Sequence, residues 1–324
     1  MTTTEDPQVV ELRARRLVAQ HLASRHRLSS ALEVVQHLLA IQGQLHNSGI
    51  QAISCRCAEG EEGVEKLLAA SQIVRTWSQR GTHHYLAAED ARWMMRLCSP
   101  RVEAAAKKRR PGLGLTEEMF ESARDVLCAA LAEGPVSRTE AYSLIAAAGV
   151  DPGNQCGPHI LRSLGSVGDI VQAPRRKKED VFMLVEQLPV AQRELEGDAA
   201  LAELGTRYFR SRGPATVKDL AWWSGLTMVQ AKRAAALAEG VVPVQLAGVE
   251  YLMADWQLGI SDEELRDGLS QRYKLPAFDE YLLGYQDRSA VCPPELVPVV
   301  GPTRNGVCRP FVVEHGVVTG VGEQ

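Results

Sequence analysis

The sequence predicts a mainly α-helical protein with small β elements, arranged as three tandem winged-helix units. Three observations lead to this fold class. Apolar residues recur at helical spacing through most of the chain. Short strand-like segments joined by turn residues follow each group of helices. The sequence Gly134-Pro135-Val136-Ser137 recurs as Gly213-Pro214-Ala215-Thr216, and each copy places a turn proline and a hydroxyl N-cap before a helix.

The first unit is expected over residues 1–110. Helices are predicted at 8–25, 31–42 and 64–70, with one more between them that is capped by Asn47 or Ser48. Strands at 73–79 and 83–87 flank Arg80-Gly81-Thr82, which is a hairpin of the length that forms a wing. A further helix carries Trp93, and Pro111-Gly112 after it marks the boundary of the unit.

The same order is expected twice more, over residues 111–190 and 191–274. In the second unit a helix begins at the N-cap Thr116, helices follow Ser137 and Gly157-Pro158, and strands 169–172 and 180–184 form a hairpin. In the third, a helix ends at Arg212, the next contains Trp222 and Trp223, and another follows Thr227. Strands at 241–244 and 250–253 complete this unit.

Residues 275–324 differ in composition from the rest of the chain, with Val-rich runs separated by Gly and Pro. Strands are expected at 296–300, 307–313 and 317–318, with Glu314-His315-Gly316 as a tight turn between the last two.

The composition is that of an ordinary globular protein. The chain has 324 residues, of which 45% are hydrophobic and 23% charged. It contains no long apolar run and no signal-peptide pattern, so a cytoplasmic protein that does not span a membrane is expected. The seven cysteines are scattered and form no Cys-x-x-Cys repeat, so neither zinc, a disulfide framework nor any other cofactor is expected.

The net charge of −4 argues against a uniformly basic nucleic-acid coat, but the basic residues are clustered. One cluster is Lys107, Lys108, Arg109 and Arg110. The other is Arg175, Arg176, Lys177 and Lys178, at the tip of the second predicted hairpin. Such a local patch binds phosphates by releasing counterions, whatever charge the far side carries. Each cluster taken alone is equally consistent with a solvated loop.

The segment from Leu39 to Asn47 carries the most specific signal. An apolar helical pattern stops at Gln42-Gly43-Gln44, where Gly43 permits a positive φ and two carboxamides project from a turn. From these residues alone, a helix cap is the simpler interpretation.

Together with Ile73-Val74-Arg75-Thr76-Trp77, Arg80-Gly81-Thr82-His83-His84 and the segment from Leu275 to Tyr285, this motif resembles the tandem winged-helix family of bacterial DNA glycosylases typified by AlkZ and YcaQ. The glutamine at position 44 resembles the AlkZ-like branch, since the YcaQ-like branch has aspartate there. The resemblance spans nearly the whole chain, and it implies a small C-terminal β-barrel at 275–324.

The resemblance assigns Gln42 and Gln44 as the catalytic residues. Glutamine is not a base, but an alkylated purine is already cationic and leaves readily, so positioning water and stabilising the oxocarbenium-like sugar is sufficient. No lysine is placed as a Schiff-base nucleophile, which indicates a monofunctional enzyme. Asp279 is the first candidate for an overlooked base; with Tyr281 and Arg288 it could instead bind phosphate or hold the C-terminal region in place.

The partner implied is double-stranded DNA containing alkylated bases, bound by a monomer without metal. The residues expected to contact this DNA are Asn47, Arg75, Trp77, Arg80, Thr82, His83, Lys107, Lys108, Arg109, Arg110, Arg175, Arg176, Lys177, Lys178 and Arg288. The alternatives are a noncatalytic winged-helix regulator and an interaction protein with an inactive site. A glycosylase assay separates the enzyme from both.

Overall fold

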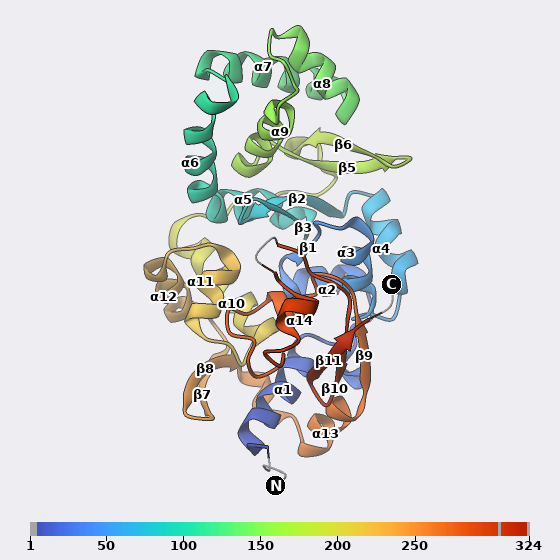
Figure 1. The fold of residues 1–324 in the computed structure, drawn as a ribbon, viewed down its shortest axis with the longest axis vertical. Helices are drawn as coiled ribbons and strands as arrows, with labels where there is room; N and C mark the ends of the chain where they lie inside the picture. The colour runs from blue at the N-terminus through green and yellow to red at the C-terminus, as the bar shows by residue number, and fades with distance from the viewer. Residues whose placement is uncertain (1–4, 304–305, 323–324) are drawn as a thin grey trace. The chain divides into compact units, whose positions relative to one another are not determined.

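The computed structural model describes residues 5–303 and 306–322, and it is mostly helical with small antiparallel sheets (Figure 1). The chain divides into two compact units. One combines Met1–Glu65 with Gly197–Gln324, and the other is Lys66–Glu196. The expected division at residues 110, 190 and 274 stays a prediction.

The first part of the discontinuous unit holds the segment with the two glutamines. Its helices and strand are α1 (Pro7–Ala19), α2 (Ala31–Leu38), β1 (Ile41–Gln42), α3 (His46–Ser54) and the start of α4 (Gly60–Ala69). Three expected boundaries are wrong, and one of them is the end of the second helix, which lies at Leu38 rather than at residue 42. The first helix ends at Ala19 rather than at residue 25, and α3 begins at His46, so neither Asn47 nor Ser48 is its N-cap.

The second part of this unit supplies the elements that pack around that segment. They are α10 (Gly197–Arg212), α11 (Val217–Ser224), α12 (Met228–Leu237), β7 (Val241–Leu246), β8 (Val249–Ala254), α13 (Asp262–Ser270), β9 (Arg272–Leu275), α14 (Glu280–Leu283), α15 (Val297–Val300), β10 (Phe311–Glu314) and β11 (Val317–Val321).

The C-terminal strands form an open sheet in the order β11-β10-β9, so the described residues do not close the expected barrel. The predicted strand at 296–300 is also wrong, because this segment is the short helix α15. A short apolar run does not distinguish strand from helix by periodicity, and a proline in the first helical turn favours the helix. The turn at Glu314-His315-Gly316 is confirmed.

The unit formed by residues 66–196 contains a sheet covered on both faces. Its elements are β2 (Ile73–Gln79), β3 (Thr82–Ala87), α5 (Ala91–Cys98), α6 (Pro100–Arg109), α7 (Glu117–Glu133), β4 (Val136–Ser137), α8 (Arg138–Ala147), α9 (Cys156–Val167), β5 (Ile170–Arg176) and β6 (Glu179–Leu184). Its strands run in the order β3-β2-β5-β6-β4, so the first two predicted hairpins share one sheet.

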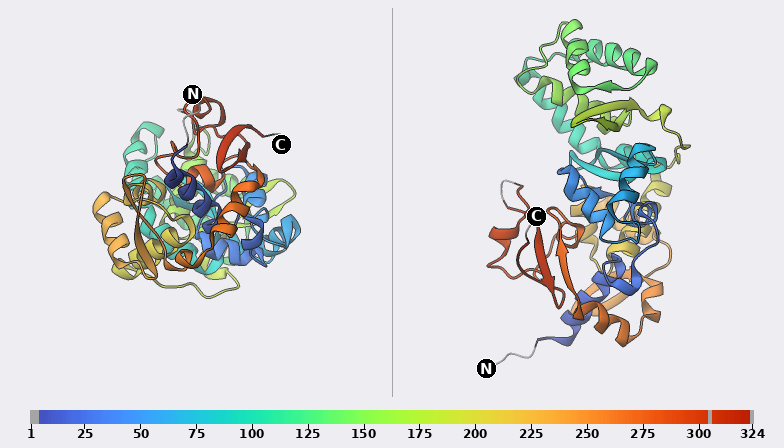
Figure 2. Two further views of the ribbon diagram at one scale, coloured as in Figure 1. Left: turned by 90° about the horizontal axis from the view of Figure 1, so that it is seen from below. Right: turned by 90° about the vertical axis from the view of Figure 1, so that its right-hand side faces the viewer.

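Alternation along the strands explains the two faces. Phe182 packs with Leu127 and Leu164 into a core built by α7, α8 and α9, whereas Val181 and Met183 face the core that includes Met95 of α5. Helices α7, α8 and α9 lie on one side of β5 and β6 in each of the side views (Figures 1 and 2).

The sequence repeat is confirmed as a structural repeat. Ser137 and Thr216 are both N-caps in capping boxes, with Glu140 and Asp219 as the reciprocal partners. The residue before each cap pairs with a hairpin strand: Val136 pairs with β6, and Ala215 forms a bridge to β8. The order helix, short extended segment, two helices and hairpin therefore occurs around both caps.

Candidate active site and DNA-contact residues

The backbone before Gln42 makes an unusual turn. Helix α2 ends at Leu38, and Leu39 adopts φ +65° and ψ −53°. The Ala40 amide donates to the Leu38 carbonyl at 2.7 Å, which closes a γ-turn. The positive φ expected at Gly43 is therefore found instead at Leu39. A leucine in this conformation is strained, and such strain persists only where the surrounding structure holds it.

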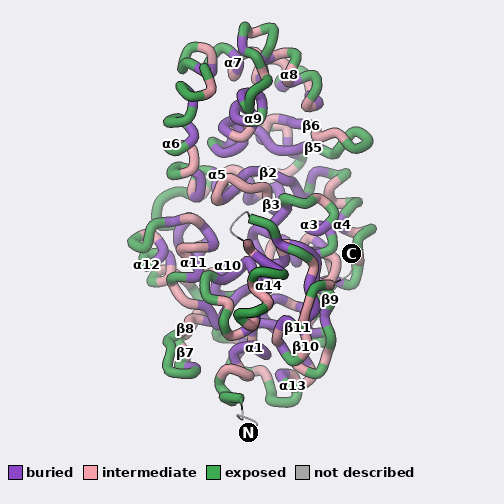
Figure 3. Tube along the Cα trace, viewed as in Figure 1, coloured by how far each residue is buried: buried purple, intermediate pink, exposed green. Residues whose placement is uncertain are grey.

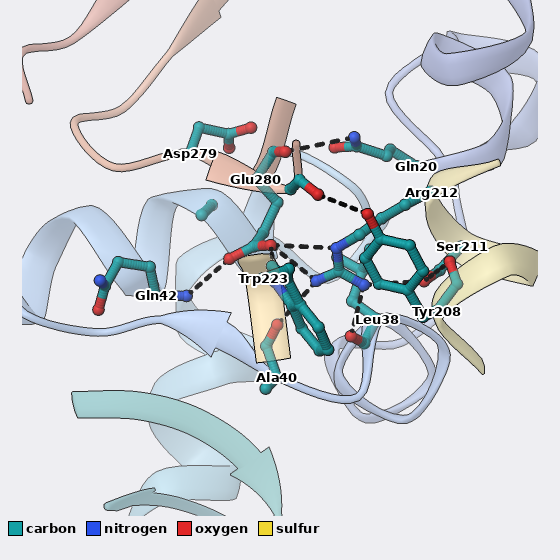
Figure 4. Close-up of polar contacts among 12 residues, drawn as sticks. Gln20, Leu38, Ala40, Gln42, Tyr208, Ser211, Arg212, Trp223, Asp279 and Glu280 are labelled. Carbon is teal, nitrogen blue, oxygen red and sulfur yellow. Dashed lines mark hydrogen bonds and ion pairs between the residues drawn. The ribbon is translucent and has the colours of Figure 1, made fainter. Parts of the chain in front are cut away.

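Arg212, at the end of α10, holds this γ-turn from both sides. Its guanidinium donates to the Leu38 carbonyl and to the Ala40 carbonyl, each at 2.9 Å (Figure 4). The same side chain is fully buried and lies over the ring of Trp223, with 4.2 Å from the guanidinium carbon to the ring centroid. A planar guanidinium with several N–H donors in fixed directions can bind both carbonyls of such a turn at once.

Glu280, the first residue of α14, completes the arrangement. One carboxylate oxygen accepts from Arg212 at 2.7 Å and from the indole of Trp223 at 2.9 Å, and the other accepts from the backbone amide of Gln42 at 3.1 Å (Figure 4). Glu280 is also fully buried. We call Arg212 and Glu280 the turn clamp, because together they bind the backbone on both sides of Leu39 and at Gln42.

The side chain of Gln42 shapes the next turn. Its amide oxygen accepts from the backbone amides of Gly43 and Gln44, at 2.9 Å and 3.1 Å. Two backbone donors directed at one carboxamide atom identify that atom as oxygen. Gln42 is buried, whereas Gln44 is exposed. The two glutamines therefore differ: Gln42 is buried and organises the backbone, and Gln44 is exposed.

A cavity of about 440 Å³ opens directly after Gln44, at the start of α3. Leu45 and Asn47, both exposed, contribute to its lining together with Ser48. Leu45 keeps 45% of its surface exposed, which is high for a large apolar side chain. The predicted contact residue Asn47 is thus accessible and lies within three positions of Gln44.

Asp279 does not have the environment of a general base. It is fully buried, and its carboxylate binds Arg56 through two hydrogen bonds at 2.7 and 2.8 Å while it accepts from the Tyr281 amide as the N-cap of α14. Arg56 is itself buried and donates to the Gln20 carbonyl. Asp279 therefore anchors the segment that presents Glu280, which is the structural role considered for it.

Arg288 and Tyr281 contribute to the same region. The Arg288 guanidinium lies over Trp222, with 4.5 Å to the ring centroid, and donates to the Leu282 carbonyl at 2.7 Å. The Tyr281 hydroxyl donates to the Gly316 carbonyl at 2.7 Å. Both side chains hold the C-terminal segment in place, and DNA contact by Arg288 stays a prediction.

The predicted DNA-contact residues on the first hairpin of the 66–196 unit differ in how deeply they are buried. Arg75 is buried and donates to Gln172 at 2.5 Å. Trp77 keeps only 7% of its surface and packs in the core, against Gly165, where a Cβ atom would collide with the indole. Arg80 with φ +53° and Gly81 with φ +72° form the tight turn, beside the partly exposed Thr82.

Adjacent histidines on β3 point to opposite faces, as expected for a strand. His84 is fully buried, whereas His83 is partly exposed and lies 4.4 Å from the Trp77 ring, centroid to centroid. Burial lowers the pKa of His83 to about 2, and the charges of Arg75 and Arg138 act in the same direction. His83 is therefore a neutral imidazole at physiological pH.

The two basic clusters differ in accessibility. Arg110 is buried, pairs with Glu103 at 2.8 Å and Glu117 at 2.7 Å, and lies over the Phe120 ring, so it is a structural residue. Its neighbours Lys107, Lys108 and Arg109 are exposed.

The second cluster lies at the end of the β5–β6 hairpin, which is exposed (Figure 3). Arg175 pairs with Asp180 at 3.2 Å and Arg176 with Glu140 at 3.5 Å. The chain turns at Lys177 and Lys178, where φ of Lys177 is +61°. Both lysines are exposed, and no ion pair is recorded for either among the described residues.

Residues 5–303 and 306–322 contain neither a metal-binding group nor a membrane-spanning helix. No group of His, Cys, Asp and Glu side chains is placed to hold a metal ion there. No helix in the same residues is long and apolar enough to cross a membrane.

Helix-and-hairpin repeats together with a carboxamide pair on a clamped turn fit one class of enzyme, the DNA glycosylases. The model of the AlkZ-like DNA glycosylases matches residues 35–324, and the chain therefore belongs to the AlkZ-like DNA glycosylase family. It is an enzyme of the DNA glycosylase class. The resemblance expected from the Gln-Gly-Gln motif is confirmed.

Among solved structures, the chain is similar to the DNA glycosylase AlkZ of Streptomyces sahachiroi. The TM-score is 0.79 at 22% sequence identity, and the match covers 98% of this chain and 88% of that chain. At this identity the likeness supports the fold. No curated protein matches the chain.

The turn clamp was missed by sequence reasoning, although both residues stand in motifs that the sequence displays. Two consecutive acids, Asp279 and Glu280, interrupt an apolar segment, and Arg212 directly precedes the Gly-Pro repeat. Carboxylates in apolar surroundings are seldom buried without a cationic partner, and this signal could have identified them as buried pairs.

Proposed function

We propose that this protein is a monofunctional glycosylase that hydrolyses the N-glycosidic bond of alkylated nucleotides in duplex DNA. The substrates proposed are purines substituted at N7 or N3, including bulky adducts and interstrand crosslinks. The role proposed is base-excision repair or self-resistance to an alkylating toxin in the cytoplasm. The repeated helix-and-hairpin order supports three winged-helix units that bind this DNA as a monomer.

The observation that carries the proposal is that the two glutamines on the clamped turn have different environments, one buried and one exposed. Because the Gln42 oxygen accepts from two backbone amides, the exposed Gln44 is better suited to accept from a water molecule. A carboxamide oxygen also carries partial negative charge, which stabilises the positive charge that develops on the sugar.

The lesion class is inferred from how the acids of the segment next to this turn are buried and paired. Asp279 and Glu280, the acids of the neighbouring segment, are both fully buried and paired with arginines. A neutral base such as uracil leaves as an anion and needs more assistance than a purine that already carries positive charge. Carboxamides that only position water and stabilise charge therefore favour cationic lesions.

The test is the release of free modified base from duplex DNA containing N7-methylguanine, measured in single-turnover reactions. The expected products are free N7-methylguanine and DNA with an intact abasic site. A parent protein that binds the duplex but releases no base from it, or from DNA with a bulky N7 adduct, would favour the noncatalytic regulator. Strand cleavage accompanying release would exclude the monofunctional mechanism.

A further inference from the structure

The unit formed by residues 66–196 contains a cavity of about 170 Å³ that the proposed chemistry does not use. Its walls come from α6, α8, α9 and the β2–β3 hairpin. The polar lining side chains that matter for the argument are Arg109, Arg138, Arg162, Gln155 and His159. A water molecule needs about 10–15 Å³ of such volume, so a phosphate-sized group fits with room for solvent.

The lining is strongly cationic. It includes three arginines and no carboxylate. Glu103 and Glu117 pair with Arg110, which is not part of the lining, whereas Asp180 pairs with the lining residue Arg138. Within the described part of the chain, neither Arg109 nor Arg162 has a hydrogen-bond or ion-pair partner.

Arg109 and Arg162 are close enough to act on each other. The pKa of the Arg162 guanidinium is lowered by its partial burial and then by the positive charge of Arg109, while Glu103 acts weakly in the opposite direction. Two like charges turned toward one concavity destabilise each other unless an anion lies between them. The geometry is therefore that of a cavity complementary to negative charge.

His159 adds a neutral donor to this wall. It is 4% exposed, and its Nε2 accepts from Arg110 Nε at 3.5 Å, which leaves the proton on Nδ1. Burial, followed by the charges of Arg162, Arg110 and Arg109, lowers its pKa to about 4. An anion in the cavity would reverse part of that effect, so His159 is a built-in reporter of occupancy.

We propose that this cavity binds one phosphate group of the DNA backbone, with Arg109 and Arg162 as its principal ligands. The proposal rests on the proposed function in that the ligand is taken to be duplex DNA. Guanidinium groups match the tetrahedral oxygens of a phosphate through paired hydrogen bonds, and such contacts fix the register of a protein on its duplex. Free inorganic phosphate shares this chemistry and is the alternative source.

The first experiment observes His159 directly. The full-length protein is labelled with ¹⁵N-histidine, and the His159 signals are identified by their absence in His159→Gln. Undamaged duplex DNA and inorganic phosphate are then added separately. We expect the duplex to raise the pKa of His159 by at least one unit. No change with either probe would overturn the site, and a change with inorganic phosphate alone would overturn its assignment to DNA.

The second experiment measures binding of undamaged duplex as a function of salt. Arg109→Ala with Arg162→Ala should weaken binding about tenfold or more and reduce the salt slope by about 0.9, the value for one phosphate contact. Arg162→Lys should keep the slope. Arg266→Ala removes an exposed arginine from α13 in the other unit, and this control should behave as the parent. A double variant with the parent's slope and affinity would exclude the site.

These readouts are independent of catalysis, because they use undamaged DNA. A parent that binds DNA through the cavity but releases no base would refute the proposed glycosylase substrate and leave the phosphate site intact.

Discussion

Arg212 and Glu280 form a fully buried ion pair, 2.7 Å between Nη2 and Oε2, that binds the backbone on both sides of the strained Leu39 and the amide of Gln42. The pair joins α10, α14 and the glutamine turn. Its two partners lie far apart in the sequence, so the conformation of the Gln-Gly-Gln motif depends on segments that do not adjoin it.

The turn clamp is expected to position the site as well as stabilise the fold. Glu280→Gln keeps the shape but leaves Arg212 as an unpaired buried charge, and the cost should be about 3–5 kcal/mol of unfolding free energy. Arg212→Met combined with Glu280→Gln removes both charges and should recover much of that stability. Excision should remain at least tenfold below the parent, because the Leu38 and Ala40 carbonyls lose their donor. Urea unfolding measures the stability of each variant, and single-turnover kinetics measure its excision rate. Recovery of both stability and excision in the double variant would show that the clamp is structural only.

The two glutamines should respond differently to substitution. Gln44→Ala should lower single-turnover excision about 10- to 1000-fold while affinity for DNA stays within a few fold, because an exposed positioning group is removed. Gln44→Asp should remain active, with an altered range of lesions. Gln42→Ala should also lower the unfolding free energy by about 1 kcal/mol, since two backbone amides lose their acceptor. Gln42→Glu restores an acceptor and serves as the matched variant. Parent-like excision by both alanine variants would move the active site elsewhere.

Lesion selectivity should follow the charge of the leaving base. Duplexes containing N7-methylguanine should be processed, whereas uracil and hypoxanthine duplexes should be stable for the duration of the assay. Asp279→Asn should destabilise the protein by disturbing the buried pair with Arg56, without changing this preference. Efficient uracil excision by the parent that is abolished in Asp279→Asn would identify Asp279 as a base after all.

Charge reversal should separate surface cations from structural ones. Lys177→Glu with Lys178→Glu, at the exposed hairpin turn, should weaken binding to any duplex and lower its salt dependence without changing the melting temperature. Arg110→Glu should instead unfold or strongly destabilise the protein, because Arg110 is buried between two glutamates. Duplex titrations at several salt concentrations, with melting curves for each variant, provide the test. Parent-like binding by the lysine double variant would remove this hairpin turn from the DNA contact surface.

Acid should destabilise the protein through its buried histidines. Burial, with His21 adding to it, lowers the pKa of His37 to about 3, while its Nε2 donates to the Ala19 carbonyl at 2.8 Å. The unfolded chain therefore binds a proton at this site that the folded chain does not, and stability should fall as pH drops from about 6.5 toward 3, by at most about 1.4 kcal/mol per pH unit. His37→Gln should flatten the dependence measured by urea unfolding, and the exposed His315→Gln should leave it unchanged. Equal slopes in all three proteins would contradict the pKa shift.

Local patterns were sufficient for much of the secondary structure. The caps at Thr116, Ser137 and Thr216 are predictable because a hydroxyl before a helical pattern satisfies the first orphan amides wherever the helix packs. The hairpins at residues 73–87 and 170–184 were predicted from alternation and turn residues. The short segment 296–300 was not, because five residues carry too little periodicity to separate strand from helix.

Side-chain roles were harder to predict than elements. Trp77 and Arg110 lie within conspicuous motifs, and both are largely structural: the indole fills a space over Gly165, and the guanidinium pairs with two glutamates. A basic run in the sequence shows how much charge is present, but not which of its members is turned inward. That depends on which acids and rings the fold brings beside each one.

The sequence by itself determined the family, the helix-and-hairpin repeat and the position of the glutamine motif, because these depend on residue identity, capping and spacing along one stretch of chain. Only the tertiary structure decided that Leu39 rather than Gly43 adopts the positive φ, that Gln42 is buried and Gln44 exposed, and that Asp279 and Glu280 are anchors. The reason is physical. A strained turn and a buried carboxylate are stable only when partners from α10, α11 and the segment that follows α3 satisfy them, and those partners meet only after the chain has folded.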